Sequence, residues 1–459
     1  MHPNQPAAQR QRVLAHIADT DVGGFFDLLT APQLLDRGEA LQPPFRERVY
    51  SPTETLAMFM TQALSADGSC RAVVNAAAVR RALDGDAPLA TNTSAYCQAR
   101  ARLPLPMIAT LAREAAGLVT KAAPGWWLWQ GRRVRLVDGA TVTLSDTPQN
   151  QAKYPQPASQ KAGLGFPIAR LVALVCLATG AVLDAALGPC AGKGSDEQTL
   201  LRELLDSLQS GEILLGDAFY ATYFLLCELV RRGVDGLFEQ HGARKRSTDF
   251  RLGERLGARD HLIVLTKPKK RPDWMSPEEY ACAPATLTVR EFQAGGKIMV
   301  TTLLCPKATP KSMLKVLYRQ RWHVELDLRN LKTTLGMEHL RCKTPAMALK
   351  ELWVYLLAYT LIRLLMAQAA LVADQIPRQL SFKHVVQIWG CVLQRGGTRD
   401  SVCIHALLVM MAEPRVGRRA GRIEPRALKR RLKSYPLLTK PRKIAREEVR
   451  EHGHPKKQR

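Results

Sequence analysis

Hydrophobic and polar positions follow two different periodicities along this chain. In the first 125 residues, apolar positions recur with helical spacing, and Ser51-Pro52-Thr53-Glu54 has the residues of a helix capping box before LAMFMTQAL. Further apolar helices are expected from about 71 to 83 and near 107 to 121, where Ala123-Pro124-Gly125 follows. We therefore predict a helical N-terminal domain over residues 1–125.

After residue 125 the hydrophobic pattern changes to one typical of an α/β fold. The β-branched or aliphatic runs VRLVDGATVTL, ARLVALVCLATGAVLDAAL, EILLGDAF and DGLFE are separated by SDEQTLLRELLDSL and TYFLLCELVRR, which have helical spacing. Thr179-Gly180 predicts a hairpin turn, so the first three strands are expected to be antiparallel. A helical crossover then joins the fourth strand. Residues 126–240 are predicted to form the first part of a core.

The pattern changes again from 241 to 308. The short runs HLIVLTK, ATLTVREF and KIMVTTLL predict an all-β insert. Thr309-Pro310 then begins a helix that is expected to run to Gly336. We assign residues 309–375 to this helix and a closing helix of the core, and residues 376–459 to a helical, basic C-terminal region.

The apolar stretch from 352 to 372 is long enough to span a bilayer, but Arg363 lies at its middle. A charge there costs about 2.5 to 3.5 kcal/mol on insertion scales, so a buried core helix is predicted, without membrane association. The start, MHPNQPAAQRQRV, lacks the apolar core of a signal peptide. The ten cysteines include no CxxC pair and are expected to be free thiols in the cytoplasm.

The net charge of the chain indicates which class of binding partner it has. The 459 residues include 66 Lys and Arg against 41 acids, a formal net charge of +25. The last 47 residues, 413–459, hold 17 of the basic residues with five Glu, and so supply nearly half of the excess. An excess this large predicts a polyanionic partner, most often nucleic acid and less often an anionic membrane.

The stretch YRQRWHVELDLRNLK, residues 318–332, concentrates charge on one helical face. At about 100° per residue, Tyr318, Arg321, Arg329 and Lys332 all fall within about 40° of Glu325. Asp327 falls on the opposite side. An apolar stripe borders the charged face, formed by Leu317, Val324, Leu328, Leu331 and Leu335. Periodicity alone favours a surface ion-pair ladder over a functional site.

Two further carboxylates make a functional site more plausible than the helix alone does. Asp217 follows ILLG, at the carboxyl end of a predicted buried strand, where open α/β sheets place their ligands. Asp138 lies in VRLVDGATVTL, although Asp-Gly between alternating hydrophobic residues alone favours a hairpin turn. With Glu325, these acids could converge on Mg²⁺, which prefers carboxylate oxygens.

The spacing Tyr318-x2-Arg321-x3-Glu325-x6-Lys332 resembles the signature of the bacterial insertion-sequence transposases of the IS4 family. These are DDE transposases with a ribonuclease H-like core. LVDGATV, GFPIARLVALVCLATGAVLDA and ILLGDAFY are similar to the segments around the first two acids of that family. The resemblance covers about 130–345, and more loosely SPTETLAMFMTQALSADGSCRAVV and SAYCQARARLP.

The resemblance implies a role for each matching residue. Asp138, Asp217 and Glu325 would be the catalytic, metal-binding triad, with two Mg²⁺ ions for which Mn²⁺ could substitute. Tyr318, Arg321 and Lys332 would hold DNA near the scissile phosphate. The implied fold is a ribonuclease H-like mixed sheet flanked by helices. Arg329 lies outside the signature, and we expect it to support Glu325 through an ion pair.

The implied function is that of a DNA transposase. It would bind the inverted-repeat ends of its own element through the helical N-terminal domain and the basic tail, cleave there, and join the 3′ ends to target DNA. A homodimer is expected to hold two ends, in association with the nucleoid. A ribonuclease H-like nuclease without strand transfer and a repurposed, non-catalytic DNA-binding protein stay open.

One feature of some relatives has no clear counterpart in this sequence. These relatives form a hairpin DNA intermediate and use an aromatic residue of the β insert to hold a flipped base. Trp274 is the only Trp of the insert, and an ordinary packed or loop residue is the favoured interpretation. Hairpin chemistry is therefore left open.

Overall fold

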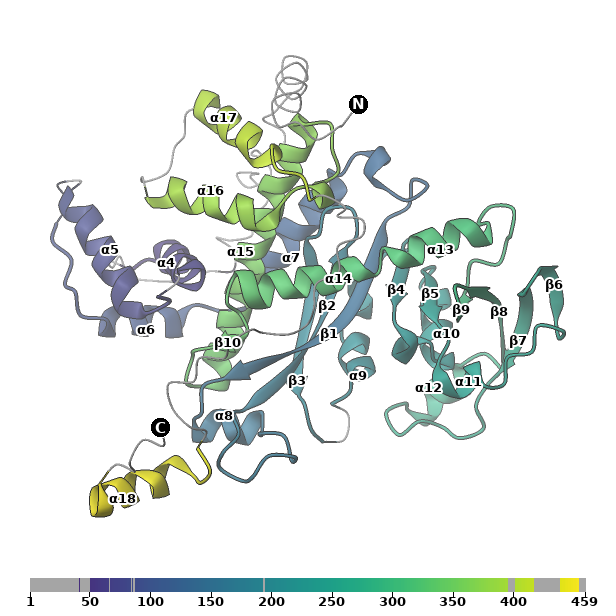
Figure 1. Cartoon of the computed structure of the whole chain (residues 1–459), viewed down its shortest axis with the longest axis horizontal. Coiled ribbons are helices and arrows are strands. Elements are labelled where there is room, and N and C mark those ends of the chain that lie inside the picture. Colours follow the sequence, from purple (N-terminus) through teal and green to yellow (C-terminus); the bar gives the residue numbers. More distant parts are fainter. Residues whose placement is uncertain are drawn as a thin grey trace, which may run out of the picture.

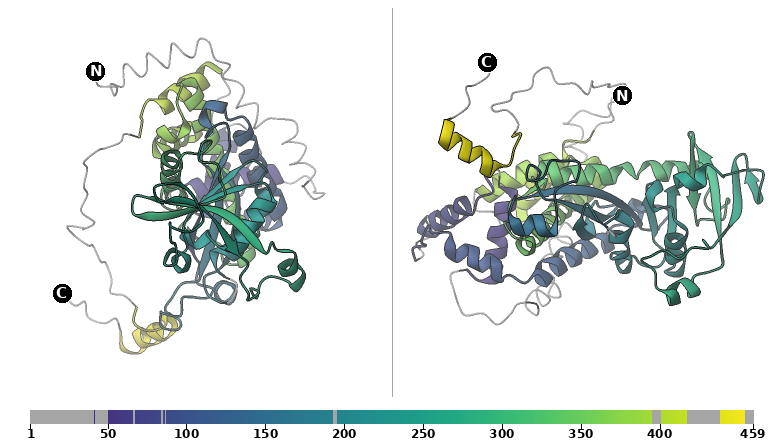
Figure 2. Two further views of the ribbon diagram at one scale, coloured as in Figure 1. Left: turned by 90° about the vertical axis from the view of Figure 1, so that its right-hand side faces the viewer. Right: turned by 90° about the horizontal axis from the view of Figure 1, so that it is seen from below.

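The computed structural model of the chain describes residues 41, 50–65, 67–83, 85, 87–192, 195–394, 401–416 and 438–453. The expected DNA-binding role of the basic tail falls largely outside the described residues, as does the predicted helical character of 1–40. Figure 1 shows a sheet that runs through the molecule, with the helices α4–α6 at one end and the insert strands β6–β9 at the other. Figure 2 shows the same elongated arrangement from below.

The described strands form one ten-stranded sheet, ordered β3-β2-β1-β4-β5-β9-β8-β7-β6 with β10 beside β1. β1 runs antiparallel to β2 and parallel to β4, and β2 runs antiparallel to β3, as the sequence predicts. The five core strands are β1 (Val134–Leu144), β2 (Ile168–Cys176), β3 (Val182–Pro189), β4 (Ile213–Gly216) and β5 (Asp235–Glu239). The others are β6 (Glu254–Gly257), β7 (Asp260–Thr266), β8 (Thr286–Ala294), β9 (Lys297–Thr301) and β10 (His339–Leu340).

Helices lie on both faces of this sheet, as a ribonuclease H-like fold requires. Those of the N-terminal region are α4 (Pro52–Leu64), α5 (Cys70–Leu83), α6 (Ser94–Arg102) and α7 (Leu105–Lys121). Those of the core and insert are α8 (Pro148–Lys153), α9 (Glu197–Arg202), α10 (Tyr223–Arg231), α11 (Gly242–Lys245) and α12 (Pro277–Cys282). Those that follow are α13 (Lys311–Arg319), α14 (Trp322–Arg329), α15 (Pro345–Val372), α16 (Phe382–Gln394), α17 (Ser401–Ala412) and α18 (Arg442–His452).

Alternation along the strands divides the core into two apolar layers. Val137 and Leu214 pack with the helices α9 and α10 on one face. Leu136 and Leu215 pack with α7, α14 and α15 on the other. Because successive side chains of a strand point to opposite faces, β1 can serve both layers and still present a polar residue where a layer ends.

The helix α15 confirms the prediction of a buried core helix. Among the described residues it alone is long and apolar enough to cross a membrane, and 89% of its most apolar stretch is buried in the protein. Arg363, at its middle, is 3% exposed and forms an ion pair with the fully buried Asp327. A buried charge is tolerated when it is paired in this way.

The insert extends the core sheet. β9 pairs antiparallel with β5, so that β8, β7 and β6 continue the same sheet outward. The insert is rich in strands, as expected, and it also contains the short helices α11 and α12. The catalytic core and the insert are therefore linked through a continuous ladder of backbone hydrogen bonds.

The expected continuous helix after Pro310 is divided into three segments. The chain tightens between α13 and α14, where the Arg321 N–H donates to the Tyr318 carbonyl at 3.0 Å and the Val324 N–H donates to the Arg321 carbonyl at 3.0 Å. These i to i−3 bonds form a tighter turn than an α-helix does. After α14, Asn330–Thr334 form a π-helical segment, and Gly336, at φ 85°, ends it as predicted.

Candidate active site

Asp138 and Asp217 lie side by side because of the parallel register of β1 and β4. Leu136 pairs with Leu215, so each aspartate stands two residues further along its own strand direction. β4 ends at Gly216 whereas β1 continues to Leu144. The edge of β1 is therefore unpaired from Asp138 until β10 pairs with it at Thr143, and both aspartates stand beside this unpaired stretch.

Asp138 is held in a mostly buried position. Its Oδ1 accepts a hydrogen bond from the Gly139 N–H at 2.9 Å, and its side chain is 19% exposed. Burial raises the pKa of Asp138 to about 6, against the opposing effect of the Gly139 N–H and of Arg321. The negative charges of Asp217 and Glu197 add to the increase. The negative charges of several carboxylates thus repel one another here, as they do in sites that bind cations.

Arg321 connects two of the predicted acids. Its Nη2 donates to Glu325 Oε1 at 2.7 Å, and its Nη1 lies 3.4 Å from Asp138 Oδ2. The first contact spans one turn of helix and the second joins α14 to β1. Asp138 and Glu325 therefore face each other across one guanidinium group.

Asp217 is oriented by its own backbone. It caps the short 3-10 helix Ala218–Tyr220, and its Oδ1 accepts a hydrogen bond from the Phe219 N–H at 2.8 Å. The other carboxylate oxygen is not used in this cap. Asp217 acts on Asp138 electrostatically, since its charge raises the pKa of Asp138.

The structure separates Glu325 from Asp327 as the helical angles predict. Asp327 is fully buried and accepts hydrogen bonds from Arg378 at 2.6 Å and from the Tyr359 hydroxyl at 2.9 Å. Arg363 also pairs with it. Glu325, at 33% exposure, faces the open side. Asp327 therefore belongs to the packing of α14 on α15, and Glu325 is available for chemistry.

A cavity of about 530 Å³ opens beside these residues, lined by Asp138, Glu325, Arg329 and Lys332 among others. Lys332 lies in the π-helical segment, which changes the direction of its side chain relative to α14. Arg329 is exposed, and Glu325 forms its ion pair with Arg321. The expected Arg329–Glu325 ion pair is not formed among the described residues. The cavity combines carboxylates at its base with cations at its rim.

Tyr318 lies near the site without lining this cavity. It belongs to α13, before the tight turn, so the angle expected for one continuous helix does not apply to it. Burial raises its pKa to about 12, and the charges of Glu239 and Asp217 contribute, so its hydroxyl stays protonated and can donate a hydrogen bond.

Glu197 is a site residue that the sequence analysis missed. It lines the same cavity from the first turn of α9 and accepts a hydrogen bond from the Tyr220 hydroxyl at 3.0 Å. A Cβ added at Gly139 would stand 2.3 Å from its carboxylate, so any larger residue after Asp138 would displace this carboxylate. In the sequence, Glu197 is an ordinary acid in the first turn of a helix, and only this adjacent glycine hints at a close approach.

The residues present fit a hard divalent cation by chemistry. All the acidic donors are carboxylate oxygens, which Mg²⁺ and Mn²⁺ prefer. However, no group of three or more His, Cys, Asp or Glu side chains among the described residues is close enough to hold a metal ion. A guanidinium group instead lies between Asp138 and Glu325. The arrangement thus has the donors for a metal, with a protein cation between two of them.

Trp274 lies outside this cavity. Its ring lies 4.0 Å from the Arg202 guanidinium and packs edge-on against Phe224, and its side chain is 47% exposed. These contacts are those of a loop residue packed against α9 and α10, the interpretation that the sequence favours.

The sequence of the chain is similar to those of known transposases. Residues 129–361, a little more than half of the chain, match the family model described as the transposase DDE domain. Transposase InsG for insertion sequence element IS4, from Escherichia coli strain K12, is 26% identical over 370 residues, covering 78% of this chain and 81% of InsG. The cryo-EM structure of the piggyBac transposase synaptic complex with hairpin DNA aligns over 86% of this chain and 80% of its own, with 10% identity and a TM-score of 0.39. The chain therefore belongs to the family of the transposase DDE domain.

Proposed function

We propose that this DNA transposase binds the inverted-repeat ends of its insertion sequence, cleaves the DNA there with Mg²⁺, and joins the 3′ ends to target DNA. The observation that most supports the proposal is that Arg321 contacts both Asp138 and Glu325, from β1 and α14, beside Asp217. Asp217 follows β4, the strand beside β1, and its charge acts on Asp138.

Asp138, Asp217 and Glu325 would hold the divalent ions that the family uses. When bound, two such ions activate an attacking hydroxyl and stabilise the leaving oxygen of a phosphodiester. The protein supplies the negative charge at the base of the cavity. Mn²⁺ is expected to substitute for Mg²⁺, because both accept carboxylate oxygens.

Glu197 would add a fourth carboxylate to this set. It approaches over Gly139 from α9, on the side of β1 away from α14, and shares one cavity with Asp138 and Glu325. Its bond from the buried Tyr220 fixes its position. It can therefore orient a ligand of the cation, such as water, from the side that Glu325 cannot reach.

Arg321, Lys332 and Tyr318 would hold the DNA backbone near the scissile phosphate. Without DNA, Arg321 neutralises Asp138 and Glu325. When a phosphate and cations enter, the guanidinium can exchange the carboxylates for phosphate oxygens, which match its planar fork. Lys332 offers a point charge from the cavity wall.

Recognition of the DNA ends is assigned to the N-terminal helices and the basic tail. The described part of this region presents exposed arginines on α5 and α6, among them Arg71, Arg80 and Arg102. A homodimer would hold two ends together in one complex, in the bacterial cytoplasm at the nucleoid. Phosphate contacts of this kind predict an affinity that falls steeply with salt.

The experiment that separates a transposase from a nuclease supplies the cleaved intermediate. A duplex with a pre-cut 3′-hydroxyl end and a target plasmid are incubated with the full chain and Mg²⁺. Joined products, absent with a 3′-deoxy end, are the expected result. Cleavage of uncut duplex without any joining would support the alternative, a ribonuclease H-like nuclease, and overturn the strand-transfer proposal.

A non-catalytic DNA-binding protein is the remaining alternative. Loss of one triad acid would favour it, but Asp138, Asp217 and Glu325 are all present at the site. The two alternatives give different results in the same assay, because a non-catalytic protein binds the end duplex and neither cuts nor joins it.

A further inference from the structure

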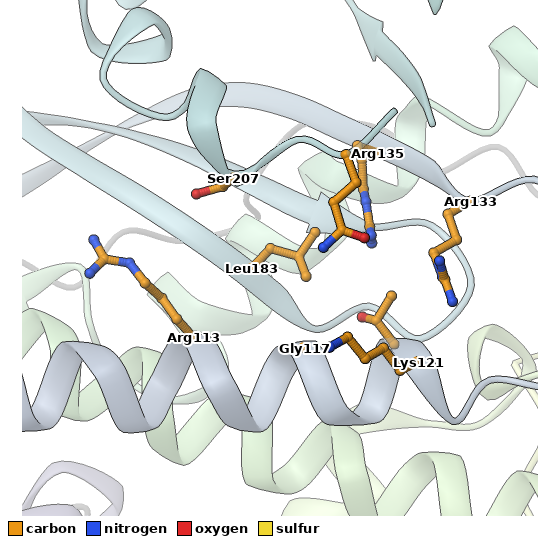
Figure 3. Close-up of a pocket in the computed structure, with 9 residues that line it drawn as sticks. Arg113, Gly117, Lys121, Arg133, Arg135, Leu183 and Ser207 are labelled. Carbon is orange, nitrogen blue, oxygen red and sulfur yellow. The ribbon is translucent and has the colours of Figure 1, made fainter. Parts of the chain in front are cut away.

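A second polar cavity lies between α7 and the beginning of β1. It has a volume of about 170 Å³ and is lined by side chains from α7, from β3, from the residues at the start of β1 and from the chain around Ser207. Figure 3 shows that Arg133 and Arg135 extend from the start of β1 toward α7, the helix that carries Lys121, and that Leu183 lies beside Arg135. None of these residues lines the cavity that holds Glu325.

The arginine at the base of this cavity is buried and only partly bonded. Arg135 is 3% exposed, and one of its nitrogens, Nη2, donates to Glu212. Its Nε and Nη1 have no hydrogen-bond partner among the described residues. Leaving such charged donors unpaired in the interior is costly, so an acceptor that enters the cavity would be bound favourably.

Other hydrogen-bond donors that line this cavity also lack an acceptor. The Thr120 hydroxyl, 3% exposed, has no partner among the described residues, and neither has Arg133 Nε. No ion pair of Lys121 or Arg133 is found within the described part of the chain. Buried polar groups are satisfied in the great majority of proteins, so two such groups lining one cavity point to a missing acceptor.

The acids beside the cavity are already engaged. Asp184 accepts from Arg113 at 2.7 Å and from the Ser207 hydroxyl at 2.5 Å. Glu212 accepts from Arg135 and from the Gln209 N–H at 3.2 Å. Counting Arg113, Lys121, Arg133 and Arg135 against these two acids leaves two positive charges without a counter-ion.

We propose that this cavity binds one phosphate group. A tetrahedral oxyanion can accept from the Arg135 fork and the Thr120 hydroxyl at once, while Lys121 and Arg133 close over it as charges. At about 30 Å³ per water molecule, a volume of about 170 Å³ corresponds to roughly six waters, which is enough for an anion of this size. The phosphate can come from the DNA backbone or from a free phosphoanion.

The test uses the full chain and a Lys121→Gln/Arg133→Gln double variant. Both positions lie at the outer side of the cavity, so the buried Arg135–Glu212 pair is kept and the fold is expected to be preserved. Lys270→Gln, which removes an exposed charge from the insert, is the matched control. Thermal unfolding of each variant without added anion verifies that the fold is intact.

The first arm titrates inorganic phosphate into each protein by calorimetry at constant ionic strength. If the source is a free anion, the double variant binds phosphate about tenfold or more weakly than the wild type and Lys270→Gln do. The second arm measures affinity for an end-bearing duplex at several salt concentrations. If the source is DNA, the double variant lowers the slope of log affinity against log salt by about 0.9 for the lost phosphate contact, relative to Lys270→Gln.

Weaker phosphate binding in the first arm, or a smaller salt slope in the second, supports the proposal and identifies the source of the phosphate. The proposal is overturned if the double variant behaves like Lys270→Gln in both arms. Cleavage activity is not used as a readout, so failure of this inference leaves the proposed chemistry at Glu325 untouched.

Discussion

Arg321 donates a hydrogen bond of 2.7 Å to Glu325, one helical turn further along the chain. The same guanidinium lies 3.4 Å from Asp138 on β1. An ion pair that looks like part of a surface ladder in the sequence is thus the link between two predicted catalytic acids. We propose that cations and a DNA phosphate separate this guanidinium from the two carboxylates when DNA binds.

Removing Arg321 is expected to separate cation binding from DNA binding. In Arg321→Ala, Asp138 and Glu325 lose their neutralising partner, so Mn²⁺ affinity without DNA should rise several-fold, because uncompensated carboxylates attract a cation more strongly. Affinity for an end-bearing duplex should fall. Calorimetric titration of Mn²⁺ and a DNA-binding assay measure the two effects. An unchanged or weaker Mn²⁺ affinity would show that Arg321 does not occupy the place of a cation.

Glu197 is expected to matter for catalysis without supporting the fold. Glu197→Gln keeps the shape of the side chain and removes its charge, so Mg²⁺-dependent cleavage should fall by about tenfold or more while the unfolding temperature stays within a few degrees. Glu203→Gln, an exposed acid at the end of the same helix, serves as control. Equal activity of the two variants would remove Glu197 from the site.

Asp327, in contrast to Glu197, is expected to support the fold. It is fully buried between Arg363 and Arg378, and Asp327→Asn leaves both arginines without their carboxylate. We expect a loss of about 3 to 5 kcal/mol in the free energy of unfolding, as for other broken buried pairs. Urea unfolding followed by circular dichroism measures it. A loss below about 1 kcal/mol would show that the network does not hold α14 on α15.

His323 predicts a specific pH dependence of stability. Burial and the charges of Arg378 and Arg363 lower its pKa to about 4 in the folded chain, against the opposing effect of Asp327. The unfolded state then binds more protons than the folded state between about pH 4 and 6.5, so the stability from this group, complete above 6.5, is lost as the pH falls. Urea unfolding at several pH values should show a shallower loss in His323→Gln. An exposed control, His339→Gln, should keep the wild-type slope.

The elements of this fold were predictable where local pattern and burial agree. The antiparallel order of β1, β2 and β3 follows from alternation and the turn at Gly180, which has a φ of 77°. The burial of α15 was predicted from Arg363 at its middle, because a charge there costs about 2.5 to 3.5 kcal/mol in a bilayer. The helical angles predict that Glu325, and not Asp327, shares a face with Arg321, whereas the burial of Asp327 was not predicted.

Features that depend on tertiary contacts were not predictable. The tight turn before α14 and the π-helical segment after it interrupt a pattern that reads as one helix, because packing on α15 and β1 decides the local hydrogen bonds. Glu197 is far from Asp138 in sequence, and only the packing of α9 over Gly139 brings them together. Pairing of Glu325 with Arg321, in preference to Arg329, depends equally on the position of Asp138.

The central claim is that Asp138, Asp217 and Glu325 carry out metal-dependent DNA cleavage. The most direct measurement compares Mg²⁺-dependent cleavage of a duplex carrying the flanking inverted repeat by the wild type, Asp217→Asn, Glu325→Gln and the control Glu203→Gln. The account predicts a loss of at least about a hundredfold for the first two variants, with DNA binding retained, and none for the control. Unchanged cleavage by Asp217→Asn or Glu325→Gln would contradict it.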